Sequence, residues 1–335
     1  MRQTDLRFGD VSGVVAAKSK AQALADAAAD IAHQLPADGL AMVLVFVSPC
    51  YDPHQFIAEM ARRFSDTPVY GCTTAGELAP DGWEENSIVA LGFSAADFAV
   101  VAQPVFDLSS FQVEEGRRIG NELRQKLLRR DSGGDDERCF GLVLIDGMCN
   151  REEAIMSAIY ASLDDIPMVG GSAGDGLRFE KTWVFFDGKA HTDAAILILL
   201  QTLLPFRPFK CDNFEPTATK MVVTEADLEQ RIVKELNAEP AAEEYSRAVG
   251  IGDTKLDPFS FASHPVLVRD QGLRAAVTRF LIVDDHPLRR EIICSLRFVV
   301  MCEDVPWRRA KAELSMRTHA ATMLGNYSTT SSRDV

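Results

Sequence analysis

Residues 67–77, TPVYGCTTAGE, and residues 166–175, IPMVGGSAGD, follow one pattern that decides the fold. In each stretch, a proline precedes a short apolar run that enters a turn of small residues. Another apolar run lies upstream of each turn, VLVFVS and LVLIDG, and a further one lies downstream, SIVALGF and AAILILL. The two prolines are 99 residues apart, and the last glycines of the turns, Gly76 and Gly174, are 98 apart. The sequence therefore predicts an internal duplication of a strand–helix–strand–loop–strand unit.

Helical patterns occupy the stretches between the apolar runs. Asp52 followed by Pro53 marks a helix start, because aspartate accepts hydrogen bonds from the first free N–H groups and proline fits the first turn. Phe56, Met60 and Phe64 then recur every four residues as one apolar face. Strands that alternate with helices predict an α/β or α+β fold with layered sheets. We expect the two turns to lie close to a common cleft.

Changes in the character of the chain divide it into three parts. Residues 10–210 hold the duplicated sheet domain, residues 211–269 begin a second, incomplete α+β domain, and residues 270–335 form an aberrant tail. In the second part, Thr224 and Asp227 have the spacing of a capping box. The sequence therefore predicts a helix that continues toward residue 236.

The tail contains residues 279–293, RFLIVDDHPLRREII, which resemble the first strand and acidic pair of a response-regulator receiver domain. Asp284 and Asp285 correspond to the metal-binding positions of that domain, where carboxylates bind Mg²⁺. Only 50 residues follow Asp285. This is too few for the remaining strands and helices, so the fragment is expected to be truncated and not to work in a phosphorelay. An incomplete second domain is also expected to expose a sheet edge and to associate.

Composition excludes several classes of protein. Of the 335 residues, 47% are hydrophobic and 25% are charged, which is typical of globular domains. The formal net charge of −14 disfavours nucleic acid and anionic membranes as partners. No run reaches the ~18 apolar residues that a membrane span needs. The seven cysteines form no CxxC pair, so the default interpretation is a reduced, cytoplasmic protein.

The chain contains neither HExxH nor GxxxxGK[ST], and the string GGSAG at residues 170–174, which has the GxSxG spacing, is not interpreted as a nucleophile elbow. We therefore expect a non-enzyme without catalytic residues or a metal site. Two alternatives stay open. The first is an enzyme that acts through Cys72 or through the loop carboxylates Glu77 and Asp175, and the second is a truncated remnant without function. For the two carboxylates, capping of the next segment is preferred over binding of an amine.

The two turns form the candidate ligand site. Small residues allow a backbone to approach a ligand closely and to direct several N–H groups at a carboxylate or phosphate. The alternative is a pair of tight strand exits that bind nothing. The candidate ligand-binding residues are Gly71, Cys72, Thr73, Thr74, Gly76, Glu77, Gly170, Gly171, Ser172, Gly174 and Asp175.

The segment YGCTTAGEL, followed in tandem by PMVGGSAGDGLRFEKTWVFFDGKAHTDAAILILL, resembles the FIST family of bacterial intracellular sensory proteins. The resemblance covers about residues 10–269, and about residues 10–210 correspond to the N-terminal domain of that family. It implies a sensor that binds a small molecule, such as an amino acid, and regulates a partner histidine kinase.

One branch of the family binds haem and senses nitric oxide. For this chain the resemblance implies a noncovalent haem, because CxxCH is absent. His191, at the entry to a buried strand, is the preferred axial ligand, and His54 and His264 are lesser candidates.

Overall fold

The computed structural model describes residues 13–79, 82–130, 138–149, 151–163, 166–176, 178–206, 216–227, 232–252, 256, 258–264, 266–269, 276–281, 292–295 and 313–317. The chain divides into two compact units. One consists mainly of the residues up to Phe209 and the other mainly of those from Lys210 onward. The fold is mixed α/β, and no helix among the described residues is long and apolar enough to cross a membrane.

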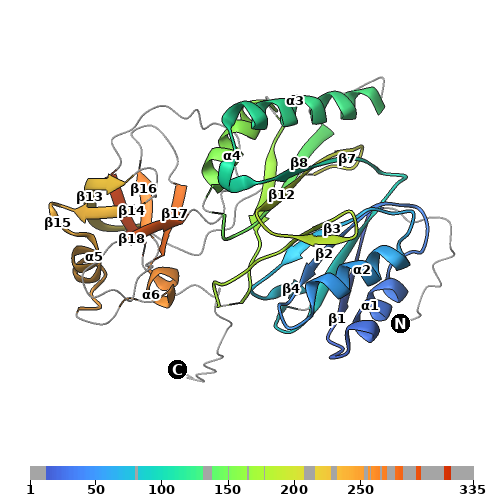
Figure 1. Cartoon of the computed structure of the whole chain (residues 1–335), viewed down its shortest axis with the longest axis horizontal. Helices are drawn as coiled ribbons and strands as arrows, with labels where there is room; N and C mark the ends of the chain where they lie inside the picture. The colour runs from blue at the N-terminus through green and yellow to red at the C-terminus, as the bar shows by residue number, and fades with distance from the viewer. Residues whose placement is uncertain are drawn as a thin grey trace, which may run out of the picture. The chain divides into compact units, whose positions relative to one another are not determined.

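The first unit contains two large sheets with their covering helices and one small two-stranded sheet (Figure 1). Its first copy consists of β1 (Val14–Ser19), α1 (Leu24–Gln34), β2 (Leu40–Val47), α2 (Pro53–Arg63), β3 (Val69–Thr73), β4 (Glu77–Ala79), β5 (Gly82–Glu84) and β6 (Ile88–Ser94). Its second copy consists of β7 (Phe98–Phe106), the short 3₁₀ helix η1 (Leu108–Ser110), α3 (Val113–Arg130), β8 (Cys139–Ile145), α4 (Glu152–Tyr160), β9 (Met168–Ser172), β10 (Val184–Phe186), β11 (Lys189–His191) and β12 (Ala194–Thr202).

The sheet topology confirms the predicted duplication. The first sheet has the order β1-β6-β2-β3, and the second has the matching order β7-β12-β8-β9. In both sheets the second and third strands of the copy run parallel, as β2 with β3 and β8 with β9. Each pair is joined through a helix, α2 or α4. The two apolar runs with their small-residue turns are thus the same element in each copy.

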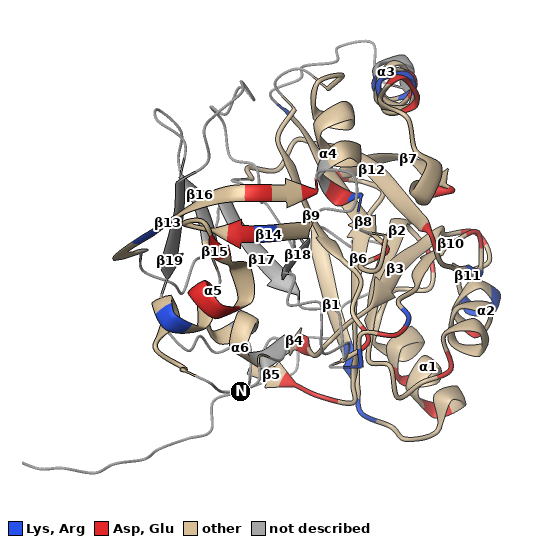
Figure 2. Cartoon of the chain, turned by 60° about the vertical axis from the view of Figure 1, so that its left-hand side comes forward, with Lys and Arg blue, Asp and Glu red and all other residues tan. Residues whose placement is uncertain are grey.

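Successive side chains along each strand point to opposite faces of the sheet, and this alternation divides the core into layers. On β2, Val43 and Val45 pack with α1 and α2, whereas Met42 and Leu44 face the second sheet. The strands β2, β8 and β12 contain no charged residue, and charged residues lie mainly on helices and connections (Figure 2). Two faces of each sheet are therefore buried, which gives helix, sheet, sheet and helix layers.

The two copies differ in the connection that follows their parallel pair. Between Thr73 and Ile88 the first copy has 14 residues, whereas between Ser172 and Ala194 the second has 21. In the second copy the connection forms the hairpin β10–β11, whose strand β10 pairs with β3 of the first sheet. The hairpin β4–β5 of the first copy forms a separate two-stranded sheet.

The start of α2 confirms the predicted signal. Pro53 occupies the first turn, and the Asp52 side chain accepts a hydrogen bond from the Gln55 N–H at 2.8 Å. Phe56 and Met60 are fully buried against the first sheet, and Phe64 is almost so.

The second unit contains β13 (Pro216–Asp227), β14 (Ile232–Leu236), β15 (Glu239–Pro240), α5 (Ala241–Val249), α6 (Pro258–Ser263), β16 (Val266–Arg269), β17 (Ala276–Leu281), β18 (Ile292–Ser295) and β19 (Glu313–Arg317). The helix expected from Thr224 onward is wrong, because β13 and β14 pair as antiparallel strands there. Residues 222–224, Val-Val-Thr, and the Ile232–Val233 pair favour extended backbone, and long-range pairing overrides the local capping signal.

The described strands of the second unit close upon themselves. They have the order β13-β19-β16-β17-β18-β14-β15, and β13 also pairs with β14. The expected open edge is therefore not formed by these strands. The residues that resemble a receiver domain contribute to β17 and β18, which pair antiparallel with each other. Asp284 and Asp285 lie outside the described residues.

Candidate functional site

The two small-residue turns converge, but they contact each other directly. The Gly174 N–H donates to the Thr73 carbonyl at 2.8 Å, and the Gly176 N–H donates to the Thr74 carbonyl at 3.1 Å. A Cβ on Gly174 would lie 2.9 Å from the Ala75 nitrogen. The expected cleft between the turns is thus filled by their own backbones, and a ligand has no room between them.

Glycines in the middle of strands β3 and β9 serve close packing of the backbone. A Cβ on Gly71 would lie 2.0 Å from the Val45 carbonyl oxygen, and one on Gly170 would lie 2.1 Å from the Val143 carbonyl oxygen. The same requirement occurs at the same place in both copies. These two glycines are therefore explained by strand packing without a ligand.

Gly76 has a φ of +128°, and its missing side chain leaves room for the Trp83 ring. Glycine tolerates this backbone conformation, which side chains rarely adopt. Gly171 and Ser172, at the end of β9, are half-buried.

Cys72 lies in the core between the two sheets. Burial raises the pKa of its thiol to about 12. Since the thiolate is the reactive form, this cysteine is held in the unreactive state at neutral pH. The geometry gives no support to an enzyme that uses Cys72 as its nucleophile.

A pocket of about 200 Å³ opens beside the turns. Three segments form its walls: the loop between β2 and α2, the end of β3, and the connection that leads to β10. Of the predicted ligand-binding residues, only Thr73 and Asp175 line this pocket. The lining residues are Pro49, Tyr51, Pro53, Thr73, Asp175, Arg178, Glu180, Lys181 and Trp183.

Asp175 organises the wall that belongs to the second copy. Its buried carboxylate accepts hydrogen bonds from the N–H groups of Phe179, Glu180 and Lys181 at 2.9, 2.7 and 2.9 Å. Three donors in succession bend the chain around the carboxylate. Asp175 therefore has the capping role that the sequence analysis preferred. Both of its carboxylate oxygens already accept hydrogen bonds from backbone N–H groups.

A second buried carboxylate holds the other end of this wall. Asp146, at the end of β8, accepts hydrogen bonds from the Thr182 hydroxyl and from the Asp193 N–H. The Gly147 N–H in turn donates to the Thr182 hydroxyl oxygen at 3.0 Å. The segment that carries Arg178, Glu180 and Lys181 is thus fastened on both sides before any ligand binds.

The charges at the pocket are of both signs. One guanidinium nitrogen of Arg178 donates to the Pro49 carbonyl at 3.1 Å, and the Lys181 ammonium lies 4.2 Å from the centre of the Trp183 ring. Both cations are exposed, as is Glu180. The Tyr51 hydroxyl donates to the Ala21 carbonyl at 2.8 Å. The pocket thus offers two cations, two aromatic side chains and two carboxylates, of which Asp175 is already bonded to the backbone.

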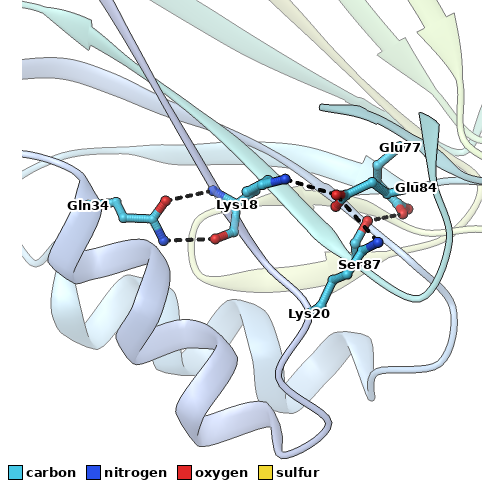
Figure 3. A network of polar contacts seen from close by, with 6 residues as sticks. All are labelled: Lys18, Lys20, Gln34, Glu77, Glu84 and Ser87. Atoms are coloured by element: carbon cyan, nitrogen blue, oxygen red, sulfur yellow. Dashed lines mark hydrogen bonds and ion pairs between the residues drawn. The ribbon is translucent and has the colours of Figure 1, made fainter. Parts of the chain in front are cut away.

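Glu77 occupies the position in the first copy that corresponds to Asp175, but its hydrogen-bond donors are side-chain hydroxyls instead of backbone N–H groups. Its buried carboxylate accepts hydrogen bonds from the hydroxyls of Thr74 and Ser87, the latter at 2.6 Å (Figure 3). Burial is the largest cause that raises its pKa, and Glu84 adds to the effect. Glu77 is not part of the pocket wall.

His191 is enclosed by aromatic side chains. Its ring stacks on Phe186, with ring centres 4.0 Å apart, and meets the edge of Phe106 at 5.5 Å. Its Nε2 is buried and makes no hydrogen bond to the described residues. Burial lowers its pKa, which favours the neutral imidazole that metals require.

A haem requires an accessible axial histidine nitrogen beside a cavity. The Nε2 of His191 is covered by neighbouring atoms and would have to be uncovered to bind iron, and His191 does not line the pocket. His54 meets the edge of the Trp183 ring at 4.5 Å, and His264 belongs to the second unit. The residues around His191 do not fit a haem.

Sequence reasoning missed most of the pocket wall, including Arg178, Glu180, Lys181 and Trp183. One signal for them existed in the duplication itself. The copies keep an offset of 98 or 99 residues up to the turns, but the following strands start at Ile88 and Ala194, 106 residues apart. The longer connection of the second copy supplies Asp175, Arg178, Glu180, Lys181 and Trp183 to the pocket.

Comparison with known proteins places these features in a family. Residues 41–239, which include most of both copies, match the family described as FIST N domain. The chain is also similar to a protein of Methanocaldococcus jannaschii named "Uncharacterized protein MJ1623", with 24% identity over 212 residues. That match covers 62% of this chain and 40% of the relative, so it spans less than half of the relative's length.

Proposed function

The chain belongs to the FIST N domain family, a family of sensory domains in signal transduction, and from this premise we propose that it is a cytoplasmic sensor of a small ligand. The ligand binds in the pocket beside the twin turns. The observation that carries the proposal is the fastened wall of residues 175–176 and 178–183, which places the cations of Arg178 and Lys181 and the carboxylate of Glu180 at one small cavity. A preorganised wall lowers the entropic cost of binding.

The chemistry of the wall favours a zwitterion of amino-acid size. A carboxylate on the ligand is recognised by the exposed cations of Arg178 and Lys181, because charge-assisted hydrogen bonds to carboxylates are the strong ones. An ammonium group is recognised by Glu180, since the Asp175 carboxylate is taken by three backbone N–H groups. The aromatic rings of Tyr51 and Trp183 supply apolar surface.

The output of such a sensor is a change in its interaction with a partner histidine kinase. Family membership is what supports this part of the proposal. A ligand shifts the protein toward one arrangement only by binding that arrangement more tightly.

The test is a ligand screen by thermal unfolding, followed by calorimetry, on the full chain. The screen uses single amino acids and matched monocarboxylates and amines. We expect a subset of amino acids to stabilise the protein and Arg178→Ala to weaken their binding by at least about tenfold. Arg62→Ala is the matched control, because Arg62 lies on α2 in an exposed ion pair with Glu59.

Two results would contradict the proposal. In the first, no amino acid stabilises the protein, which favours the remnant interpretation. In the second, an amino acid binds and Arg178→Ala has the same affinity as Arg62→Ala, which places the site elsewhere.

Nitric oxide sensing through a haem is the competing version of the sensor. The enclosed geometry of His191 speaks against it. An absorption spectrum of protein expressed with haem supply tests it, and we expect no stoichiometric Soret band. A band at one haem per chain that disappears in His191→Ala would reverse this assignment.

A further inference from the structure

The polar side chains that line the pocket fall into an exposed group and a buried group. Three charged residues are exposed, namely Arg178, Glu180 and Lys181. Three further polar residues are buried, with 5, 2 and 5% of their surfaces exposed, namely Tyr51, Thr73 and Asp175. The exposed charged groups therefore lie on the solvent side of the pocket, and the buried residues form its inner side.

The hydroxyl of Tyr51 is already bonded to the chain itself. It donates to the Ala21 carbonyl at 2.8 Å, and the Asn86 carbonyl lies 3.4 Å from it. Burial is the largest cause that raises the pKa of Tyr51, so the hydroxyl keeps its proton at neutral pH. Because this proton is donated to the backbone, the ring is what Tyr51 offers to a ligand.

Thr73 and Asp175 are bonded to the backbone in a similar way. The Thr73 hydroxyl accepts a hydrogen bond from the Trp183 N–H at 3.0 Å, and the Thr73 N–H donates to the Trp183 carbonyl at 2.9 Å, which fixes Trp183 at the wall. Both oxygens of Asp175 accept from backbone N–H groups. A polar side chain of a ligand therefore meets groups whose hydrogen bonds are already made, and it leaves water without a compensating bond.

Rings form the rest of the wall. Pro49, Pro53 and Trp183 are half-buried, and their rings join that of Tyr51 at the pocket. The Lys181 ammonium lies 4.2 Å from the centre of the Trp183 ring, so a cation already lies beside this aromatic surface. A basic side chain of a ligand would be repelled there, since like charges oppose each other's approach. The surface is thus suited to an uncharged, apolar group.

We propose that the pocket selects amino acids with an apolar side chain, and that Trp183 determines this specificity. The inference rests on the proposed function, in which the exposed charged residues bind the charged groups of the ligand. The apolar side chain lies against the rings of Tyr51 and Trp183, where it gains free energy by leaving water.

Pairs of amino acids with similar shape test the proposal by calorimetry on the full chain. Leucine and asparagine form one pair, and valine and threonine form the other. We expect leucine and valine to bind at least about tenfold more tightly than their polar partners, because a polar side chain loses hydration without gaining hydrogen bonds. Lysine should also bind more weakly than leucine, because Arg178 and Lys181 repel its side chain.

A variant of Trp183 tests the residue itself. Glycine serves as the reference ligand, because it carries both charged groups and has no side chain to contact a ring. Trp183→Ala should lower the affinity for leucine, relative to that for glycine, at least about tenfold. Trp83→Ala is the matched control and should leave this ratio unchanged, because Trp83 is a partly exposed tryptophan on β5 that does not line the pocket.

The outcomes separate this inference from the proposed function. If asparagine and threonine bind as tightly as leucine and valine, and Arg178→Ala still weakens binding, the inference is wrong and the proposed function stands. If Trp183→Ala weakens glycine and leucine equally, Trp183 does not determine specificity. If no amino acid binds, or Arg178→Ala binds like Arg62→Ala, the proposed function fails and the inference fails with it. If Trp183→Ala does not fold, the matched pairs on the unmodified chain decide.

Discussion

Glu77 and Glu84 lie directly opposite each other in the register of β4 and β5, but among the described residues only Glu84 has lysines beside it. Lys18 Nζ and Lys20 Nζ lie 2.9 and 3.4 Å from Glu84 Oε1 (Figure 3). Glu77 instead depends on hydroxyl donors in a buried place. Two carboxylates at facing positions repel each other unless one is compensated or protonated. The pKa values of the two groups accordingly shift in opposite directions.

The raised pKa of Glu77 predicts how stability varies with pH. Burial is its main cause, so the folded protein holds the proton more tightly than the unfolded chain does. The favourable contribution is present below the ordinary value of 4.5 and is lost as pH rises through the folded pKa. We expect Glu77→Gln to equal or exceed the unmodified protein in free energy of unfolding at neutral pH.

The control for this prediction is Glu84→Gln. The hydrogen bond from Lys18 is the main cause that lowers the Glu84 pKa, so its contribution is present above 4.5 and is lost at lower pH. Urea unfolding at several pH values should show destabilisation of Glu84→Gln at neutral pH. A Glu77→Gln protein that is clearly less stable at neutral pH would show that the charged form of Glu77 is the favoured one.

Asp175→Asn should loosen the pocket wall while the sheets stay folded. One oxygen of Asp175 accepts from the Phe179 N–H and the other from the N–H groups of Glu180 and Lys181. An asparagine side chain has one acceptor oxygen, so at least one of the three donors loses its partner and faces the amide NH₂ instead. Each unsatisfied donor costs about 1–3 kcal/mol, less where water can enter. We expect faster hydrogen exchange in residues 178–182 and weaker ligand binding.

Asp97→Asn is the matched control, because Asp97 accepts one backbone hydrogen bond, from Gly13 at 2.6 Å, and does not line the pocket. Equal exchange in residues 178–182 of both variants would contradict the positioning role of Asp175.

Cys72 should resist alkylation in the folded protein. Its pKa of about 12 keeps the thiolate scarce near neutral pH, and its burial excludes the reagent. Cys50, which is exposed, provides the comparison within the same chain. Mass spectrometry of peptides after brief labelling should find Cys50 modified and Cys72 intact. Labelling of Cys72 as fast as Cys50 would revive the hypothesis of a reactive thiol.

Gly71→Ala should destabilise the fold by about 1–3 kcal/mol through overpacking. The nearest atom to the added Cβ is the Val45 carbonyl oxygen, so shortening the Val45 side chain in a Gly71→Ala/Val45→Ala protein should not restore stability. Denaturant unfolding measures both variants. A Gly71→Ala protein of normal stability that fails to bind the ligand would instead indicate that Gly71 makes room for a ligand.

The duplication and its layered architecture could be predicted because they depend on short-range patterns. Apolar runs such as residues 43–48 and 142–147 are long enough to indicate buried strands, and the Asp52–Pro53 pair indicates a helix start. The same kind of local reasoning was wrong at Thr224, where a capping pattern lies in strand β13. There the pairing of Val223 with Leu236 across the hairpin outweighs the local preference.

The sequence by itself determined the two repeated units, their strands and helices, and the turns at which chemistry was expected, because apolar periodicity and turn residues act locally. Only the tertiary structure decided that Gly174 contacts Ala75 and fills the expected cleft, and that a pocket lies beside it against Arg178 and Lys181. The position of a cavity depends on how backbones from distant segments approach each other. How closely these backbones approach is set by side-chain packing between the two sheets. This packing joins residues far apart in the chain, so it cannot be inferred from local sequence patterns.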